Sequence, residues 1–308
     1  MIKLICNPHA NRGRGKSLIT QMAHELNVPL EDVAITSSIR DAEYQACMAA
    51  KNNYSSVVCA GGDGILNAVI NGILPVRDDV KVGFIPIGMN NVAALSAGIP
   101  MDISSACGVV KAGFTRKIDI GSITSSGGEL RYFFTMADCG LTAQAVFGGE
   151  SNMLFKRTCG RMAILGSGFY YYFKEKAVPM EINLDGRIEK AYLIIAVNGS
   201  YYGGNFKVAD ADMYDGKLDL CLFTGGCRRD LWRYFRAFVN GKLADFDDIL
   251  HFKVRNVTVD SPKPVRSQID GEPLGHTPCK IDIMQSRLSV FLPKNKQGTA
   301  PACVPQAL

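Results

Sequence analysis

The chain has 308 residues, 47% of them hydrophobic and 20% charged, which is the composition of a globular protein long enough for two cores. Its longest mostly apolar stretch, residues 162–173, is too short and too rich in glycine to cross a bilayer, so the composition excludes a membrane-spanning helix. The formal net charge of +5 fits an anionic ligand or an acidic membrane surface, although many proteins with neutral partners carry as much.

The first 120 residues alternate short apolar runs with helical patterns. Residues 1–6 lead into Asn-Pro without a small-residue cleavage site, so we interpret them as a strand and not as a signal peptide. The alternation predicts a parallel sheet with helices on its faces, whose ligands bind at the carboxyl ends of the strands. The predicted strands are 2–6, 33–36, 56–60, 82–86 and 117–120, and the predicted helices are 16–26, 41–52, 65–72, 91–97 and 103–112.

After about residue 123 the pattern becomes mainly that of strands, which predicts an antiparallel domain with a β-sandwich as the default. Asp185-Gly186 indicates a tight hairpin turn, and the Ser- and Gly-rich segment 122–128 indicates a junction or hairpin tip. The polar tail from Lys294 is expected to be disordered. The predicted strands are 131–136, 180–184, 192–197, 218–223, 252–259 and 288–292, and the predicted helices are 152–174 and 228–240.

The most informative segment is Cys59-Ala60-Gly61-Gly62-Asp63-Gly64, between the apolar run 56–58 and a predicted helix. Three glycines at such a turn let the backbone come very close to a ligand. The N-terminus of the following helix offers N–H groups and a partial positive charge, which suit phosphate. Asp63 would repel phosphate unless a metal ion or a catalytic role justifies it, so the segment predicts phosphoryl transfer.

Two further loops are expected at the same edge of the sheet, 7–17 and 84–92. The first is not a Walker A loop, because Ala10 stands where a Gly is required, nor a dinucleotide fingerprint, because the third Gly is replaced by Leu18. Taken alone, one is equally well a solvated loop and the other a capped helix start. Their position beside Gly61 favours phosphate binding.

Two acidic segments lie in the second half of the chain. In 267–274, Asp270 and Glu272 flank one glycine, and a base next to a metal-holding acid is what a hydroxyl needs to attack phosphorus. The spacing by itself favours an ordinary hairpin turn with solvated acids. The acid-rich loop 210–219 has oxygen ligands suited to Mg²⁺ or Ca²⁺, but it lacks the EF-hand pattern and is equally an acidic turn.

The helix predicted at 228–240 is amphipathic. A basic face with a tryptophan at its border could rest on anionic lipid, although a packed helix with a solvated charged face is the commoner case. The apolar face holds Leu231, Phe235 and Phe238, the opposite face holds Arg229, Arg233 and Arg236, and Trp232 lies at the border.

Cysteine and histidine carry little functional signal. The ten cysteines include no Cys-x-x-Cys pair, and the four histidines are isolated, so zinc and redox chemistry are poorly supported. Several cysteines lie in apolar runs as small buried residues, which fits a reducing cytoplasm.

Together these segments resemble those of the diacylglycerol-kinase-like lipid kinases, which include bacterial diacylglycerol kinases and sphingosine kinases. The matching segments recur in the family's order across residues 2–292. They are NPHANRGRGKS, Thr36 before Asp41-Ala42, CAGGDGILNAVINGIL, GFIPIGMNNVAALSAGIP, RKIDIG, NGSYYGGNFKVADADMYDGKLDL and QIDGEPL.

The resemblance implies a three-layer α/β nucleotide-binding domain at 1–122, with a returning strand at about 287–294. It implies a mainly antiparallel β-sandwich domain for the lipid substrate at 123–286, with 295–308 as a disordered tail. The residues it assigns to ATP are Asn7, Thr36, Gly61, Gly62, Asp63, Gly64, Ile65, Leu66, Asn67, Gly88, Met89 and Asn90.

The resemblance also assigns the chemistry. Asp270 and Glu272 match the family's catalytic pair, with Glu272 as our choice for the proton acceptor, and Asp119 would support the metal and phosphate region. The residues that match a structural Mg²⁺ site are Asp212, Asp215 and, through its carbonyl, Lys217.

Several residues depart from the family's usual pattern. Ile65 replaces a Thr, Ala68 a Glu, Met89 a Thr or Ser, and Asn91 an Asp found in many members. Each lost hydrogen bond to a charged group is worth roughly 1.5–3 kcal/mol, so together they could slow the reaction or change the nucleotide. The Asp-Gly-Glu pair is retained.

We therefore expect a cytoplasmic, peripherally membrane-associated lipid kinase of phospholipid metabolism, which moves the γ-phosphoryl of ATP, with Mg²⁺, to a lipid hydroxyl in an interdomain cleft. The expected partners are a lipid at a membrane surface and a second copy of the chain, without nucleic acid. The alternatives are a kinase with a soluble acceptor such as NAD, and a nucleotide- or lipid-binding homologue that lacks turnover.

Overall fold

The computed structural model of the chain describes residues 1–10, 15–150, 177–202, 206–239 and 246–294. It divides into two compact units, Met1–Arg116 with Ser289–Leu308 (unit 1) and Lys117–Leu288 (unit 2). The boundary expected near residue 122 falls inside strand β5, Thr115–Thr124. The predicted helix 152–174, the loop residues 11–14 and the predicted tail 295–308 lie outside the described residues.

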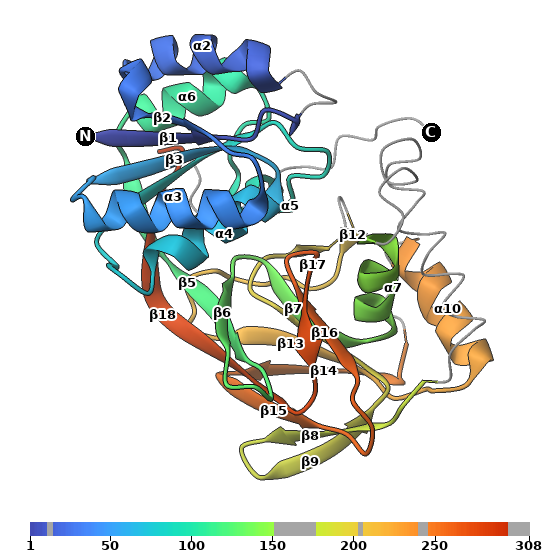
Figure 1. Ribbon diagram of the computed structural model, residues 1–308. Helices are drawn as coiled ribbons and strands as arrows, with labels where there is room; N and C mark the ends of the chain where they lie inside the picture. The colour runs from blue at the N-terminus through green and yellow to red at the C-terminus, as the bar shows by residue number, and fades with distance from the viewer. Residues whose placement is uncertain (11–14, 151–176, 203–205, 240–245, 295–308) are drawn as a thin grey trace. The chain divides into compact units, whose positions relative to one another are not determined.

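Unit 1 is built on four parallel strands in the order β2-β1-β3-β4, and Ser289 and Val290 of β18 pair in parallel with β4. Helices α2 and α6 cover one face of this sheet and α3 and α4 the other (Figure 1). Because both faces are covered, β3 is buried along its whole length and reads as an unbroken apolar run. The strands are β1 (Ile2–Cys6), β2 (Val33–Ile35), β3 (Ser56–Gly61) and β4 (Lys81–Pro86).

The helices of unit 1 agree closely with the expected ones. Helix α4 begins earlier than predicted because Gly62 acts as its N-cap and its carbonyl accepts the N–H of Ile65 and of Leu66. The helices are α2 (Gly15–Leu26), η1 (Leu30–Asp32), α3 (Ile39–Lys51), α4 (Asp63–Ile73), α5 (Val92–Ala97) and α6 (Ile103–Lys111).

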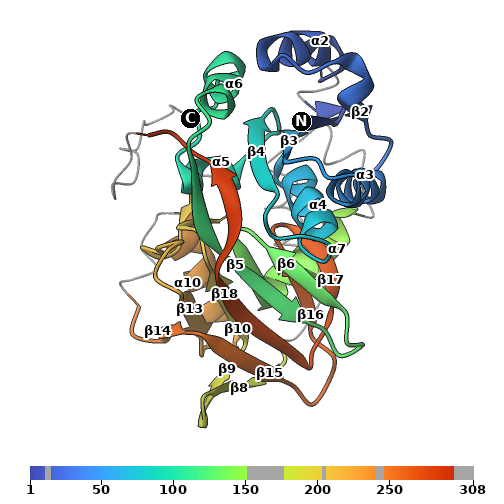
Figure 2. The same ribbon diagram turned by 90° about the vertical axis from the view of Figure 1, so that its left-hand side faces the viewer.

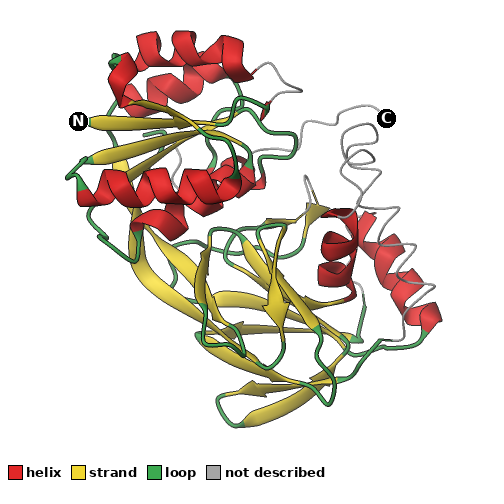
Figure 3. Cartoon of the chain, viewed as in Figure 1, coloured by secondary structure: helices red, strands yellow, loops and turns green. Residues whose placement is uncertain are grey.

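In its described residues, unit 2 consists mainly of antiparallel strands in two large sheets and a two-stranded sheet of β11 and β12, with helices α7 and α10 beside them (Figure 3). One large sheet has the order β14-β13-β10-β7-β16-β17. The other joins β18, β15, β8 and β9, with β5 next to β18 and β6 next to β5 (Figure 2). The predicted α/β domain followed by an antiparallel β domain is therefore confirmed.

The strands of unit 2 are β5, β6 (Leu130–Phe133), β7 (Met136–Gly140), β8 (Met180–Leu184), β9 (Arg187–Ala191), β10 (Leu193–Val197), β11 (Tyr201–Tyr202), β12 (Phe206–Lys207), β13 (Leu218–Phe223), β14 (Ile249–Val254), β15 (Asn256–Asp260), β16 (Arg266–Ile269), β17 (Glu272–His276) and β18 (Cys279–Phe291), and the helices are α7 (Leu141–Glu150) and α10 (Arg228–Val239).

Two cores stabilise unit 2. The larger lies between the two sheets and is formed by residues such as Phe133, Ile194 and Leu220. The smaller lies on the other face of the sheet that contains β7, where Met136 and Ile195 pack with residues of α10. Alternate residues of β7 therefore face different cores, as the two-residue period of a strand requires.

Two strand predictions for unit 2 were wrong in detail. The single strand 252–259 is two strands, β14 and β15, in different sheets, and 131–136 is divided between β6 and β7. The predicted hairpin turn at Asp185-Gly186 is confirmed, and it joins β8 to β9, a strand that the sequence prediction lacked. Asp185 has φ +51° and Gly186 φ +96°, the left-handed pair that a two-residue hairpin needs.

Candidate active site

The loops that follow the four parallel strands of unit 1 are joined by backbone hydrogen bonds. The N–H of Asn7, after β1, donates to a carbonyl of β3 at 3.0 Å, and the N–H of Thr36, after β2, donates to a carbonyl of β1 at 2.9 Å. The N–H of Gly88, after β4, donates to the carbonyl of Gly61 at 3.0 Å. The structure thus brings these predicted nucleotide loops to one edge of the sheet.

Glycine is required where two of these loops meet. A Cβ atom at Gly88 would lie 2.4 Å from the Cα atom of Gly62, and one at Gly61 would lie 2.8 Å from Cγ1 of Ile65. Gly62 is also the N-cap of α4 and gives it no side-chain cap. The result is a bare backbone surface at a helix N-terminus, which suits a phosphate group.

Asp63 has a structural partner at this edge. Its carboxylate accepts the N–H of Val92 at 3.0 Å and the N–H of Ala93 at 2.9 Å, which are the first two residues of α5. A carboxylate there satisfies N–H groups that the helix itself leaves unpaired. The structure therefore supplies a reason for this charge that the sequence did not suggest.

Asn91 closes the turn that carries Gly88. Its side-chain oxygen accepts the N–H of Gly88, and its side-chain nitrogen donates to the Gly88 carbonyl, both at 3.0 Å. An aspartate cannot donate the second bond. Asn91 also has φ +50°, a conformation that Asn tolerates well. The departure from Asp at this position thus has a structural explanation.

The side chains of several predicted nucleotide residues point into the protein. Thr36 is buried and its hydroxyl donates to the Cys6 carbonyl at 3.2 Å. Ile65 and Leu66 are core residues, and the side-chain oxygen of Asn67 accepts a hydrogen bond from Asn71. Only backbone atoms of Ile65 and Leu66 are therefore available to a ligand.

The remaining predicted residues lie at the loop surface. Met89 is 61% exposed, and Asn90 and Gly64 are partly buried. The Asn7 side chain accepts the N–H of His9 at 2.9 Å and so shapes the start of the first loop.

In unit 2, the carboxylate of Asp270 is bound to the segment between β6 and β7. It accepts the N–H of Phe134 at 2.7 Å, of Thr135 at 2.8 Å and of Met136 at 3.1 Å, and also the Thr135 hydroxyl at 2.6 Å. These bonds use both carboxylate oxygens and hold the bend between β6 and β7. Asp270 thus fixes the turn between β16 and β17.

Glu272 stands two residues later, at the start of β17, and is partly exposed. Its neighbour Gly271 has φ +86° and Asp270 has φ +48°, so the turn has two left-handed residues. The turn presents Glu272 at the end of the hairpin, where solvent can reach it.

Asp119 lies on β5 and is almost fully buried. Its carboxylate accepts the N–H of Gly216 and the N–H of Ser286, both at 2.7 Å, and its own N–H donates to the carbonyl of Met213. Asp119 therefore holds the acidic loop that contains the predicted metal ligands.

The predicted Mg²⁺ ligands lie on this one loop. Asp212 accepts the N–H of Tyr214 at 3.0 Å, and Asp215 accepts the N–H of Lys217 at 2.9 Å. The second oxygen of Asp215 lies 2.8 Å from Nζ of Lys253, and this bond raises the pKa of the lysine.

The donor set of the loop is compatible with Mg²⁺. Two carboxylates and a carbonyl fit this ion, which usually keeps several waters, but Lys253 competes for one oxygen of Asp215. Within the described ranges, no group of three His, Cys, Asp or Glu residues is placed to hold a metal. A metal here would depend on the carbonyl of Lys217 and on water.

One buried acid was missed by the sequence prediction. Asp138 on β7 is fully buried, and burial raises its pKa to about 6. Its Oδ2 accepts the Tyr202 hydroxyl at 2.8 Å and the side-chain amide of Gln268 on β16. The available signal was an acid in the otherwise apolar run Met136–Cys139.

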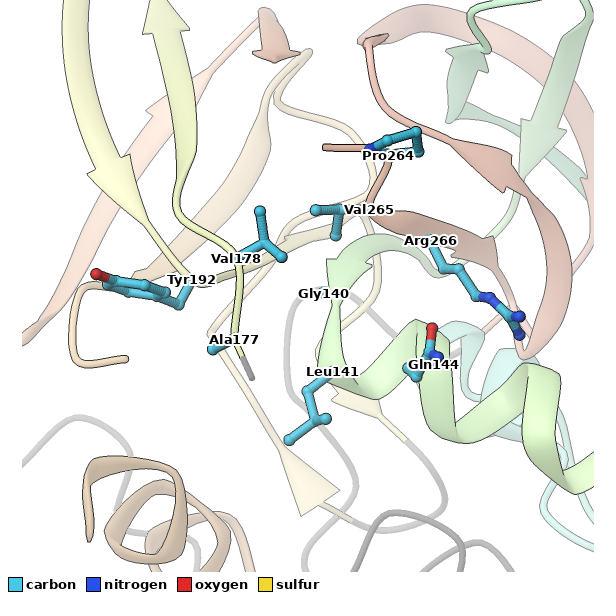
Figure 4. Close-up of a pocket in the computed structure, with 9 residues that line it drawn as sticks. All are labelled: Gly140, Leu141, Gln144, Ala177, Val178, Tyr192, Pro264, Val265 and Arg266. Atoms are coloured by element: carbon cyan, nitrogen blue, oxygen red, sulfur yellow. The ribbon is translucent and has the colours of Figure 1, made fainter. Parts of the chain in front are cut away.

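A small pocket opens in unit 2 beside the start of α7 (Figure 4). Val178, Val265 and Leu141 form its apolar wall, and Arg266 and Gln144 lie next to each other at one end. Its volume of about 70 Å³ is far below the roughly 300–1,000 Å³ of sites for drug-sized ligands. As formed by the described residues, it is too small for a lipid.

Helix α10 packs against the smaller core through Leu231, Tyr234 and Ala237. Tyr234 meets Phe223 edge to face, with ring centroids 5.0 Å apart. The predicted apolar face is confirmed for Leu231, whereas the side chains of Phe235 and Phe238 lie outside the described part of the chain.

The opposite side of α10 is basic. Trp232 is 42% exposed and stands among exposed arginines, whereas Arg233 turns back and lies 3.3 Å from Asp248. Arg233, which the sequence assigns to the basic face, therefore has an acidic partner. The exposed arginines of α10 are Arg228, Arg229 and Arg236. In the described part of the chain, no helix combines the length and the apolar character needed to cross a membrane.

Comparison with known proteins places both halves of the chain. Residues 1–123 match the diacylglycerol kinase catalytic domain, and residues 170–292 match the YegS C-terminal NAD kinase beta sandwich-like domain. A diacylglycerol kinase of Staphylococcus epidermidis is 27% identical over 302 residues, 95% of this chain and 92% of that protein. A diacylglycerol kinase of Staphylococcus aureus is 28% identical over the same shares.

Solved structures support the fold. A Bacillus anthracis diacylglycerol kinase structure aligns with a TM-score of 0.70 at 21% identity and covers 95% of this chain and 97% of its own. A second Bacillus anthracis structure, described as a candidate enzyme of this kind, aligns with a TM-score of 0.77 at 24% identity and covers 95% of both chains. At these identities the likeness concerns the fold alone.

Proposed function

Because this chain belongs to the diacylglycerol kinase family, we propose that it is a lipid kinase that transfers the γ-phosphoryl group of ATP to a lipid hydroxyl. The observation that carries the proposal is the glycine surface of unit 1. Hydrogen bonds join four strand-end loops there, and the glycines at positions 61, 62 and 88 leave the backbone at the start of α4 without side chains over it.

This surface suits a triphosphate in two ways. Close approach to the backbone is possible because no side chain fits between the loops at Gly62 and Gly88. The charge of Asp63 is offset by the N–H groups of α5, so it opposes the phosphates less than an unbonded carboxylate would. Catalysis by such a site is mainly positioning and electrostatic stabilisation.

Glu272 is the proposed general base. Asp270 accepts four hydrogen bonds, which use both of its oxygens to hold the chain, whereas Glu272 is partly exposed on the same turn. We assign Asp270 the role of holding the turn and Glu272 that of accepting the proton of the lipid hydroxyl.

Mg²⁺ is proposed in two roles. One ion accompanies ATP and offsets the charge of its phosphates. A second would be held by Asp212, Asp215 and the carbonyl of Lys217, where it would stabilise the loop that Asp119 anchors.

We propose that α10 brings the enzyme to the membrane from the cytoplasm. Trp232 stands among Arg228, Arg229 and Arg236, and an aromatic ring surrounded by arginines suits the interface of an anionic bilayer. Co-sedimentation with vesicles of anionic phospholipid should be weakened about tenfold or more in Arg229→Ala/Arg236→Ala, with Arg187→Ala as a control at an exposed arginine of β9. Equal binding by both variants would contradict this role.

The function is tested with radiolabelled ATP and a mixed lipid extract. Label is expected in organic-soluble product with the wild-type protein and to be nearly absent with Glu272→Gln. Label found only in water-soluble product would instead support a soluble acceptor, and ATP binding without transfer would support a non-catalytic homologue.

A further inference from the structure

Asp138, Gln268 and Tyr202 form a buried polar cluster in unit 2. Asp138 and Gln268 are directly opposite each other on β7 and β16, and neither side chain is exposed. They lie on the face of the sheet that carries Met136 and Ile195, which is otherwise apolar. A carboxylate in such a place is costly, because burial raises its free energy relative to water.

The hydrogen bonds of the cluster lead to the turn of Glu272. Asp138 Oδ2 accepts from the Tyr202 hydroxyl and from the amide nitrogen of Gln268. The amide oxygen of Gln268 then accepts the N–H of Gly271 at 2.7 Å. Gly271 is the residue between Asp270 and Glu272, so one continuous chain of bonds runs from Asp138 to the turn.

Asp138 determines the direction of this chain. An ionised carboxylate only accepts hydrogen bonds, so the amide of Gln268 must turn its nitrogen toward Asp138 and its oxygen toward Gly271. If residue 138 could also donate a hydrogen bond, the side-chain amide of Gln268 could flip. Its NH₂ group would then face the N–H of Gly271, and the bond to the turn would be lost.

The turn is therefore fixed from two sides. Asp270 binds the backbone at Phe134–Met136, and Gln268 binds the backbone of the turn itself at Gly271. A bulge in the pairing of β16 with β17 lies between Ser267 and Gln268, where the strand leaves regular register. Because the strand pairing is irregular there, the side-chain bonds give the turn additional support.

We propose that Asp138 and Gln268 are positioning residues for phosphoryl transfer, which fix the backbone at Gly271 and thereby the direction of the Glu272 carboxylate. The proposal rests on the proposed function, because Glu272 has to be the base. It predicts that loss of the chain of bonds lowers kcat and leaves the affinity for nucleotide, which is bound by unit 1, unchanged.

The main test is Gln268→Met, which keeps the length of the side chain and removes both bonds. We expect kcat to fall by about 30- to 100-fold, while KM for ATP stays within about twofold. Asp138→Asn, which can donate toward the amide, is expected to lower kcat by about tenfold.

The matched control is Thr277→Val, at the other end of the same hairpin. Thr277 is buried. Its hydroxyl accepts the N–H of Val265 at 2.9 Å and is also hydrogen-bonded to the Ser261 hydroxyl, so its loss removes hydrogen bonds without touching the turn. Thr277→Val should lower thermal stability as Gln268→Met does and keep kcat. Similar losses of kcat in both variants would overturn the proposal.

A second measurement does not depend on activity. Hydrogen exchange of the peptide that contains Gly271 should become faster in Gln268→Met and stay unchanged in Thr277→Val. If Gln268→Met does not fold, Asp138→Asn gives the same comparison. Unchanged exchange with unchanged kcat overturns the proposal.

The two proposals fail in different ways. An active Glu272→Gln protein contradicts the base itself and with it the positioning role. An inactive Glu272→Gln protein next to a fully active Gln268→Met protein contradicts only the positioning role.

Discussion

The glycine turn of unit 1 and the acidic turn of unit 2 use their carboxylates in the same unexpected way. Asp63 accepts two backbone N–H groups of α5, and Asp270 accepts three between β6 and β7. In each turn, the sequence suggests a catalytic or metal-binding role for the acid, but in the structure its carboxylate binds backbone N–H groups. In the proposed function, phosphate binding depends on backbone N–H groups of unit 1, and proton transfer depends on Glu272 of unit 2.

The type of residue in a motif therefore does not identify its role. A carboxylate with several N–H donors mainly stabilises the folded chain, because each donor would otherwise be left unpaired. A carboxylate at the end of a hairpin, reachable by solvent, can exchange a proton. Substitutions at the two kinds of acid should therefore separate activity from stability.

The largest effect is expected for Glu272→Gln. Loss of a general base should lower kcat by roughly 10²–10⁴-fold, with little change in KM for ATP and in the free energy of unfolding. Steady-state transfer of labelled phosphate and thermal denaturation measure both quantities. Activity near the wild-type level would mean that Glu272 is not the general base and that the turn of unit 2 does not supply the proton acceptor.

Asp270→Asn should affect stability most. An amide has only one accepting oxygen and brings two N–H donors toward the N–H groups of Phe134–Met136, so the free energy of unfolding should fall by about 3 kcal/mol. Urea denaturation measures the loss. A variant that is as stable as the wild type but inactive would make Asp270 the catalytic acid instead.

Asp138 is a third acid, and it differs from the other two because it is fully buried. Burial raises its pKa in the folded protein to about 6, from an ordinary value of 3.8. The folded state therefore holds the proton more strongly, and the contribution of Asp138 to stability falls as pH rises from about 4 to about 6, by about 3 kcal/mol in total. Asp138→Asn has no carboxyl group at this position, so this part of the pH dependence of stability is absent. Urea denaturation at pH 4.5 and pH 7 should show a smaller loss in the variant, and parallel pH curves would contradict the buried charge.

The smallest effect is expected for Asp63→Asn. Asn keeps one accepting oxygen for the start of α5 but loses the charge, so stability should fall by about 1 kcal/mol. ATP affinity should be retained or improved slightly, because the negative charge beside the phosphates is removed. Isothermal titration with ATP checks this, and a loss of affinity above tenfold would indicate that Asp63 acts on the nucleotide or its metal.

The local elements of unit 1 were predictable, because each strand there is a single apolar run bounded by a polar loop. The helices at 16–26 and 103–112 agree with α2 and α6 within a residue. In unit 2 the prediction was poorer. Strands β14 and β15 are separated only at Arg255, and no turn residue marks the point where the chain passes from one sheet to the other.

The sequence alone determined the family pattern, the alternation of strands and helices, and the glycine turn, because these depend on local periodicity and on where a side chain is absent. Tertiary structure decided which acids are structural. The partners of Asp63, Asp119 and Asp270 lie far from them in the chain, and Asp138 meets Gln268 only because β7 and β16 pair. Hydrogen bonds between distant segments have no sequence period, so only the folded chain reveals them.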